Sequence, residues 1–145
     1  MTAVKYEQDF YAWAMQIAQA LREGRLSEAD LAHVAEELEG MGRSEKRALT
    51  NRLAVLLRHL LKWWHQPERR GNSWRYTIEE QRVRVAKLLE DNPSLKHELE
   101  GMVSHAYRLA VLRTAKEIGI SKSVFPDTCP FTLEQILDDG FWPEL

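Results

Sequence analysis

The sequence has a single cysteine, Cys129, among its 145 residues. One cysteine cannot form an intrachain disulfide, and it excludes a zinc site built from several cysteines. Long hydrophobic runs are also missing: the apolar stretch from Leu53 to Leu57 has five residues, whereas a membrane-spanning helix needs about 20. Glu7 and Asp9 stand where a signal peptide would be apolar, so we expect a cytoplasmic protein without a membrane segment.

Glycine and proline are sparse, with seven and five residues, and they fall between stretches of helical periodicity. No stretch alternates apolar and polar residues as a half-buried strand would. The sequence therefore predicts an all-α protein, a single-domain helical bundle over residues 1–145 with five main helices and a short C-terminal helix.

Capping residues and chain breakers set the expected helix boundaries. Ser27 with Asp30 starts the second helix. This helix is expected to end near Gly40 or Gly42, and Ser44 to cap the third. Further start and stop signals are Gly24, Gly119 and the pair Thr132 and Gln135. We expect helices at about residues 6–22, 28–40, 44–66, 73–91, 94–118 and 132–139.

The apolar faces of the second and third helices predict which of their residues are buried. The second helix is expected to bury Leu31, Val34, Ala35 and Leu38. His33 lies opposite this face and is expected to contact water. The third helix is expected to be central, because its wide stripe needs more than one neighbour to cover it. That stripe consists of Leu49, Leu53, Leu56, Leu57, Leu60 and Trp64.

Gln81 lies in the middle of the apolar stripe of the fourth helix, so we expect it to be largely buried. A buried amide without partners costs about 1–3 kcal/mol, and Glu36, Glu37 and His59 are its candidate partners. One interpretation is a structural contact that fixes helix register. The alternative is a ligand or metal pocket lined by all four residues. Di-metal centres in bundles use Glu-x-x-His, a spacing absent here, so we predict no metal and no other cofactor.

Charge is segregated along the chain, although its net value is −2. Residues 52–87 hold nine basic and three acidic residues, whereas the segments on both sides are acidic. Aromatic residues are interleaved with the basic ones, a combination that binds phosphates and stacks on bases. One interpretation is pairing with acidic helices of the same chain; a second is a basic surface for an acidic protein. The third is an anion or nucleic-acid site with the candidate contacts Arg69, Arg70, Arg75 and Arg84.

Short motifs along nearly the whole chain resemble one bacterial family. They are Tyr6–Trp13, Ala35–Glu39, Met41–Glu45, His59–Trp63, Gln66–Arg69, Ser73–Trp74, Glu80–Arg82, Pro93–Leu95, Phe125–Pro126 and Cys129–Gln135. In combination they are similar to the family called domain of unknown function 29. This resemblance implies a small all-helical bacterial protein and assigns no catalytic or binding residue.

No arrangement typical of nucleophilic catalysis occurs, since the sequence has neither a nucleophile elbow nor a phosphate-binding loop. We therefore predict no catalytic residue and expect a non-enzymatic protein-interaction module with a protein partner still to be identified, or a homo-oligomer. The C-terminal residues Phe141 and Trp142 are expected to fold back over the core; the alternative is that they dock on a partner.

Overall fold

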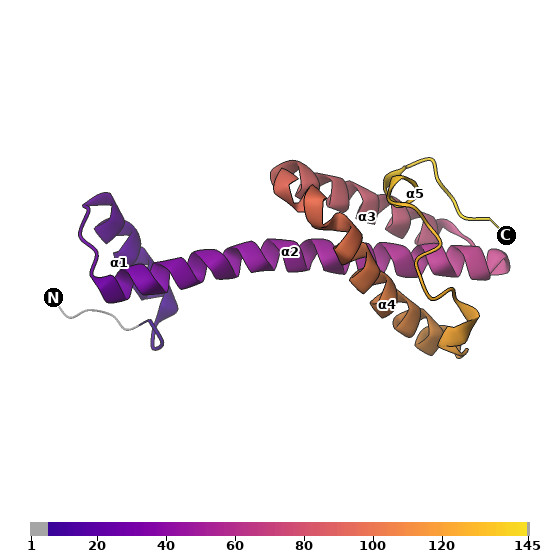
Figure 1. Cartoon of the computed structure of the whole chain (residues 1–145), viewed down its shortest axis with the longest axis horizontal. Coiled ribbons are helices and arrows are strands. Elements are labelled where there is room, and N and C mark those ends of the chain that lie inside the picture. Colours follow the sequence, from indigo (N-terminus) through magenta and orange to yellow (C-terminus); the bar gives the residue numbers. More distant parts are fainter. Residues whose placement is uncertain (1–5, 145) are drawn as a thin grey trace. The chain divides into compact units, whose positions relative to one another are not determined.

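The computed structural model describes residues 6–144, and this part of the chain is helical without a strand (Figure 1). The predicted all-α class is confirmed. The α-helices are α1 (Phe10–Arg22), α2 (Glu28–His65), α3 (Asn72–Asp91), α4 (Leu99–Ile118) and α5 (Leu133–Leu137). Short 3₁₀ turns occur at η1 (Pro67–Arg69), η2 (Pro93–Glu98) and η3 (Lys122–Val124).

Two helices begin at the predicted capping residues. The Ser27 hydroxyl accepts a hydrogen bond from the Asp30 amide at 3.1 Å at the start of α2. Thr132 and Gln135 form the reciprocal capping box of α5, in which each side chain accepts from the other residue's amide. These contacts satisfy amides that have no partner within the helix itself.

Two glycines and an aspartate set further boundaries. Gly24 and Gly119 follow α1 and α4 with φ angles of +68° and +72°, a conformation that other residues rarely adopt. The first helix begins at Phe10, later than predicted, because the Asp9 carboxylate accepts from the Ala12 amide at 3.0 Å and caps the helix there.

The sequence prediction is wrong at the centre of α2. It places a break near Gly40 or Gly42 and a new helix after Ser44, but residues 28–65 form one helix. Neither glycine adopts a positive φ, and a glycine inside a helix costs only about 0.5–1 kcal/mol relative to alanine. The hydrogen-bonded turns on both sides outweigh this cost, so the six expected α-helices become five.

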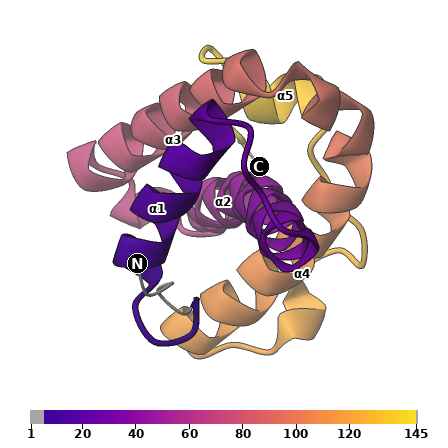
Figure 2. The ribbon, with the colours of Figure 1, turned by 90° about the vertical axis from the view of Figure 1, so that its left-hand side faces the viewer.

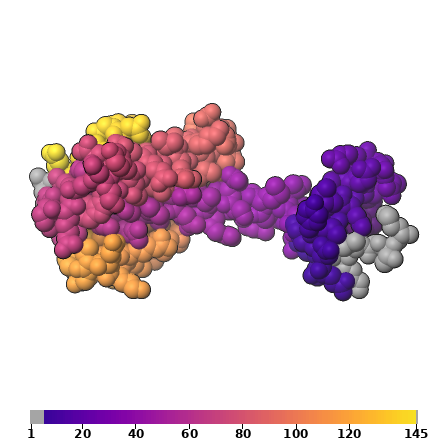
Figure 3. All heavy atoms as spheres, turned by 180° about the vertical axis from the view of Figure 1, so that it is seen from behind, coloured from indigo at the N-terminus to yellow at the C-terminus, as the bar shows by residue number. Residues whose placement is uncertain are grey.

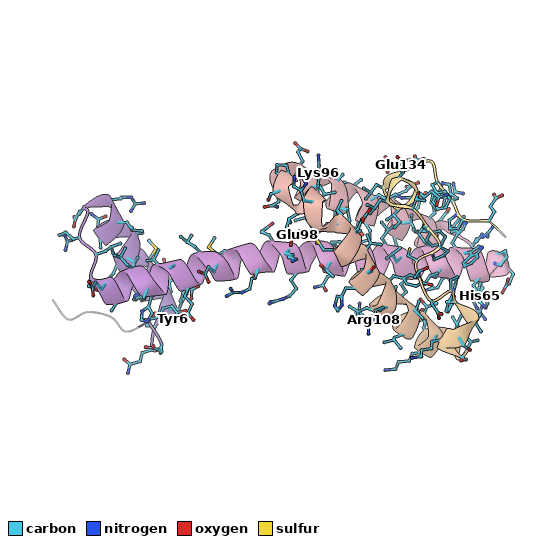
Figure 4. All side chains as sticks on the ribbon, in the orientation of Figure 1. Tyr6, His65, Lys96, Glu98, Arg108 and Glu134 are labelled. Carbon is cyan, nitrogen blue, oxygen red and sulfur yellow. The ribbon has the colours of Figure 1, made fainter. Side chains whose placement is uncertain are left out.

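The chain divides into two compact units, Met1–Ser44 and Glu45–Leu145. In the first unit, Tyr6 stacks on His33 of α2 with ring centroids 4.5 Å apart. Tyr6 also meets Trp13 of α1 edge-on at 4.8 Å. The Tyr6 hydroxyl donates a hydrogen bond to Glu37, one turn after His33, and Figure 4 labels this tyrosine beside α2. Trp13 and Ile17 are the buried apolar side chains of residues 6–44.

The packed face of α2 in the first unit is not the predicted one. Leu31 and Leu38 are 51% and 61% exposed, whereas His33, predicted to contact water, stacks on Tyr6. His33 and Glu37 lie one turn apart on the same side of α2. His33 therefore stacks on the Tyr6 ring while Glu37 accepts the hydrogen bond of the Tyr6 hydroxyl. The leucines lie on another side of the same helix and stay uncovered. The residues predicted to be buried but found exposed or half-buried are Leu31, Val34, Ala35 and Leu38.

The second unit forms around residues 45–65 of α2, with α3 and α4 on different sides of it (Figure 2). The predicted leucine stripe is confirmed, and its last member, Trp64, is partly buried. The fully buried leucines of α2 are Leu49, Leu53, Leu56, Leu57, Leu60 and Leu61. Other helices complete this core with Ile78, Val85, Met102, Ala106, Ala110 and Ile136, among others.

Replacing Gly42 by alanine tests the continuity of α2. A Cβ at Gly42 meets no atom within 4 Å, so the substitution should stabilise a continuous helix by about 0.5–1 kcal/mol. Amide hydrogen exchange at residues 38–46 measures this gain as stronger protection. In the control Gly119→Ala, the alanine must adopt a φ of +72°, so unfolding should become easier by about 1 kcal/mol. Unchanged or weaker protection in Gly42→Ala would contradict the continuous helix.

Candidate functional site

Gln81 of α3 is buried, as its position in an apolar stripe predicts, with 5% of its surface exposed. Within the second unit, which contains both residues, no hydrogen bond joins Gln81 to His59. The side-chain oxygen of Gln81 has no hydrogen-bond partner in residues 6–144. The prediction of burial is confirmed, whereas the partners of Gln81 stay a prediction. Glu37 accepts a hydrogen bond from Tyr6, and His59 donates one to Val55.

The four residues of the predicted polar pocket have separate local environments. Glu36 and Glu37 belong to the first unit, where Glu36 is exposed and Glu37 accepts the hydrogen bond of the tyrosine hydroxyl. His59 and Gln81 belong to the second unit. The His59 Nδ1 donates to the Val55 carbonyl at 2.9 Å. A common pocket of these residues stays a prediction.

Two cavities of the second unit are lined by other residues. One has a volume of about 310 Å³, and Arg108 and Phe125 lie in its wall together with residues 122–127. The other has a volume of about 490 Å³ and is lined in part by Glu98 and His105. Figure 4 labels Arg108 and Glu98 on or next to α4. None of the four predicted pocket residues lies in either wall.

Lys62 shows that a basic residue of the 52–87 segment pairs within the chain. It is buried in α2, and its Nζ donates to Glu117 of α4 at 2.9 Å. The same Nζ lies 4.8 Å from the centre of the Trp74 ring. The hydrogen bond from Lys62 holds the pKa of Glu117 below its ordinary value. This ion pair agrees with the interpretation that basic residues of the segment pair with acidic helices of the same chain.

Arg82 is a second buried cation, and it binds residues 131–143, which we call the C-terminal segment. Only 2% of Arg82 is exposed. Its Nε donates to the Ile136 carbonyl at 2.9 Å. Its Nη2 donates to the carbonyls of Gln135 at 3.2 Å and Phe141 at 2.9 Å. One guanidinium on α3 thus holds three backbone carbonyls of the C-terminal segment.

The C-terminal segment folds back over the core, as the sequence predicts. Trp142 packs on Trp63 of α2 with ring centroids 4.6 Å apart, and Phe141 packs on Phe131 at 5.8 Å. In Figure 3 this segment, in yellow, lies against the surface of α3. Its aromatic side chains are therefore partly buried within the unit.

Two of the arginines predicted as anion contacts lie against the C-terminal segment. Arg70 donates to the carbonyls of Trp63 at 2.7 Å and Pro143 at 3.3 Å. The Arg75 guanidinium lies 5.4 Å from the centre of the Trp142 ring, a distance typical of cation–π contacts. The structure thus brings Arg70 and Arg75 to the same segment.

The other two predicted anion contacts lie elsewhere. Arg84 pairs with Glu80 on its own helix at 3.1 Å, and Arg69 is exposed in η1. Sequence reasoning missed the importance of Arg82, although a signal was present. Arg82 follows Ile78 by four residues, so it lies on the buried face of α3.

The first unit exposes large apolar side chains on both of its helical segments. Those on α2 form the apolar stripe, which we define as Leu31, Val34, Leu38 and Met41. Leu38 and Met41 are 61% and 64% exposed. Helix α1 has no charged residue from Phe10 to Leu21. Its exposed large apolar residues are Phe10, Tyr11, Met15 and Leu21. Sequence reasoning missed this surface because it assigned an apolar face to the core.

The comparison with protein families shows which family the chain belongs to. A family described as a domain of unknown function, DUF29, matches residues 5–142. The chain belongs to the DUF29 family. This match confirms the family that the short motifs of the sequence indicate. No curated protein and no solved structure matches the chain.

In the described residues of this DUF29 chain, no group of three or more His, Cys, Asp or Glu residues is placed to hold a metal ion. No helix among the same residues is long and apolar enough to cross a membrane. Cys129 is half-buried, and burial raises the pKa of its thiol. A thiol with a raised pKa is protonated at neutral pH and is a poor nucleophile.

Replacing Arg82 by methionine should release the C-terminal segment of the DUF29 chain. Methionine keeps the aliphatic stem but leaves three backbone carbonyls without their donor. Hydrogen bonds to charged groups contribute about 1.5–3 kcal/mol each, but the cost of burying the guanidinium offsets part of their sum. The free energy of unfolding in urea should therefore fall by about 2–4 kcal/mol. The control Arg84→Met removes an exposed pair, which contributes about 0.3–0.5 kcal/mol. Equal losses in the two variants would contradict the role of Arg82.

The buried His59 predicts a pH dependence of stability. Burial lowers the pKa of His59; its hydrogen bond to Val55 opposes this, and Lys62 and Arg58 lower it further. The folded-state pKa therefore lies below the unfolded value of about 6.5. The unfolded chain binds more protons as the pH falls below that value, which favours unfolding. The contribution of neutral His59 to stability is complete above about pH 7 and decreases from about pH 6.5 downward to the folded-state pKa.

Urea denaturation between about pH 5 and 8 measures this effect. The variant His59→Gln should show a weaker dependence of the unfolding free energy on pH. The variant His105→Gln, which changes an exposed histidine of α4, should keep the dependence of the unmodified chain. An identical pH profile for the unmodified chain and His59→Gln would show that this histidine is not the titrating group.

Proposed function

We propose that this DUF29 chain is a non-enzymatic protein-interaction module that binds its partner through the apolar stripe. The observation that carries the proposal is the exposure of this stripe. Leu31, Leu38 and Met41 each leave at least half of their surface in contact with solvent. Soluble proteins rarely expose adjoining large apolar side chains, and such patches mark interaction sites.

The stripe offers enough free energy to contribute to binding. Full burial of a leucine or methionine side chain contributes about 1.5–3 kcal/mol. Covering the exposed half of three such side chains therefore contributes roughly 2–5 kcal/mol. The exposed Phe10, Tyr11 and Met15 of α1 add further apolar area to the same unit.

The small core of the first unit also supports a role in binding. Among residues 6–44, only Trp13 and Ile17 are buried apolar side chains. The unit has 44 residues, close to the size of about 40 residues below which a chain usually needs additional stabilisation to fold by itself. A partner seated on the apolar stripe would enlarge this core and stabilise the unit.

The basic segment supports the alternative of nucleic-acid binding less well. Arg70 and Arg82 donate to backbone carbonyls, and Lys62 pairs with Glu117. A phosphate would have to replace these partners, whereas the apolar stripe needs no such exchange. The proposal therefore assigns the basic residues that contact the C-terminal segment to the stability of the second unit.

The variant Leu38→Glu should abolish partner binding without unfolding the chain, because Leu38 is exposed. Native mass spectrometry of the untagged chain from its own cells measures the mass of any bound protein or second copy. The control Val83→Glu introduces the same charge at an exposed apolar position of α3. We expect a partner mass with the unmodified chain and with Val83→Glu, and none with Leu38→Glu. The same complexes in all three samples would contradict the proposed function.

A further inference from the structure

We propose that the occupant of the apolar stripe is a basic amphipathic helix of another protein, packed along residues 28–44 of α2. This inference rests on the proposed function, because it names the class of partner for the same surface. Three features of the first unit carry it: the spacing of the stripe, the acidic residues along its edges, and the like charges that a second copy would bring.

The spacing of the apolar stripe fits a helical partner. Its four members follow one another at steps of three, four and three residues, the spacing by which paired helices interlock their side chains. From Leu31 to Met41 the stripe rises about 15 Å along α2, which equals nearly three turns of a partner helix. Ala35 and Gly42 adjoin it, and a Cβ at Gly42 would meet no atom within 4 Å. These small residues allow the partner backbone to approach closely.

Acidic residues border the apolar stripe on both sides. At about 100° per residue, Asp30 and Glu37 lie along one edge and Glu28 and Glu39 along the other. Glu28 and Asp30 form no ion pair within residues 6–144. Glu39 pairs with Arg43 at 3.7 Å, between two exposed side chains. Glu37 already accepts the hydrogen bond of the Tyr6 hydroxyl. Asp30 on one edge, and Glu28 and Glu39 on the other, are therefore the carboxylates placed to receive cations from a partner helix.

The charge of the whole unit favours the same partner. Residues 6–44 hold eight acidic and three basic residues, a net charge of −5. Two of the three basic residues, Arg25 and Arg43, already pair with carboxylates of the unit. Residues that flank the apolar seam of paired helices set the choice of partner by their charge. Lysine or arginine at those positions of the partner complements the acidic edges.

A second copy of the chain fits the apolar stripe less well. Two copies packed stripe against stripe would bring acidic edges together, and like charges at such positions destabilise helix pairs. The buried cations of the second unit are not free to compensate, because Lys62 and Arg82 are engaged within that unit. The charge pattern therefore favours a basic helix from another protein.

Fluorescence anisotropy with two labelled synthetic helices and the full chain tests the inference. Both peptides carry leucine at the heptad spacing; one has lysine at the flanking positions and the other has glutamate. We expect the lysine peptide to bind at least about tenfold more tightly, with an affinity that falls as salt is added. Leu38→Glu should weaken its binding about tenfold or more, whereas Val83→Glu should leave it unchanged.

A second variant tests the charged edge without changing the apolar stripe. Glu28 and Glu39 are exposed, so the double variant Glu28→Gln, Glu39→Gln should remain folded, which thermal unfolding verifies. It should reduce both the preference for the lysine peptide and the salt dependence of binding. The matched control is Glu79→Gln, Glu90→Gln, which removes two exposed carboxylates of α3 and should change neither.

Equal binding of the two peptides, or binding that Leu38→Glu leaves intact, overturns the inference. A two-chain assembly that Leu38→Glu dissociates also overturns it, because the occupant is then a second copy. If neither peptide binds but native mass spectrometry shows a partner that Leu38→Glu loses, the basic helix is wrong and the proposed function stands. If Leu38→Glu unfolds the chain, the stripe belongs to a core, and both proposals are wrong.

Discussion

How far the apolar side chains of helix α2 are buried depends on how much of the chain packs against them. This constraint decides whether each unit has a large core or an exposed apolar surface. In the second unit, its leucines from Leu49 to Leu61 are fully buried because α3, α4 and the C-terminal segment supply apolar partners. In the first unit, Tyr6 occupies the side of α2 that carries His33 and Glu37. The leucines at 31 and 38 remain exposed. One helix therefore supplies core in one unit and an uncovered surface in the other.

The second unit uses its basic residues to hold its own C-terminal segment. Arg82 donates to three carbonyls of that segment, and Arg70 adds the Pro143 carbonyl. Buried backbone carbonyls need a donor, and the C-terminal segment has only the short helix α5 to supply hydrogen bonds. Three of the nine basic residues between 52 and 87, namely Arg70, Arg75 and Arg82, thus have a structural role at this segment. A cluster of arginines in a sequence need not mark a nucleic-acid site.

The sequence predicts the local features of this fold better than its tertiary contacts. The caps at Ser27 and Thr132 depend on neighbours three residues away, so the order of residues reveals them. Whether the helix continues through Gly42 depends on a free-energy difference of about 1 kcal/mol. A difference of this size cannot be predicted from the pattern of residue types. Periodicity identifies an apolar face at residues 28–44 but not whether another segment covers it. The contacts of Arg82 join residues more than 50 positions apart, and no local pattern contains that information.

The acidic edges of the apolar stripe explain how an exposed apolar surface can persist in a folded chain. Apolar faces of separate copies attract one another, and an uncharged stripe would promote self-association. Carboxylates on both edges, in a unit with a net charge of −5, oppose contact between copies through repulsion of like charges. The same carboxylates attract a helix of opposite charge and speed its association. In the proposed binding mode, a single arrangement of charge thus disfavours the chain's own copies and favours a basic partner, and the charge segregation in the sequence would have this physical role.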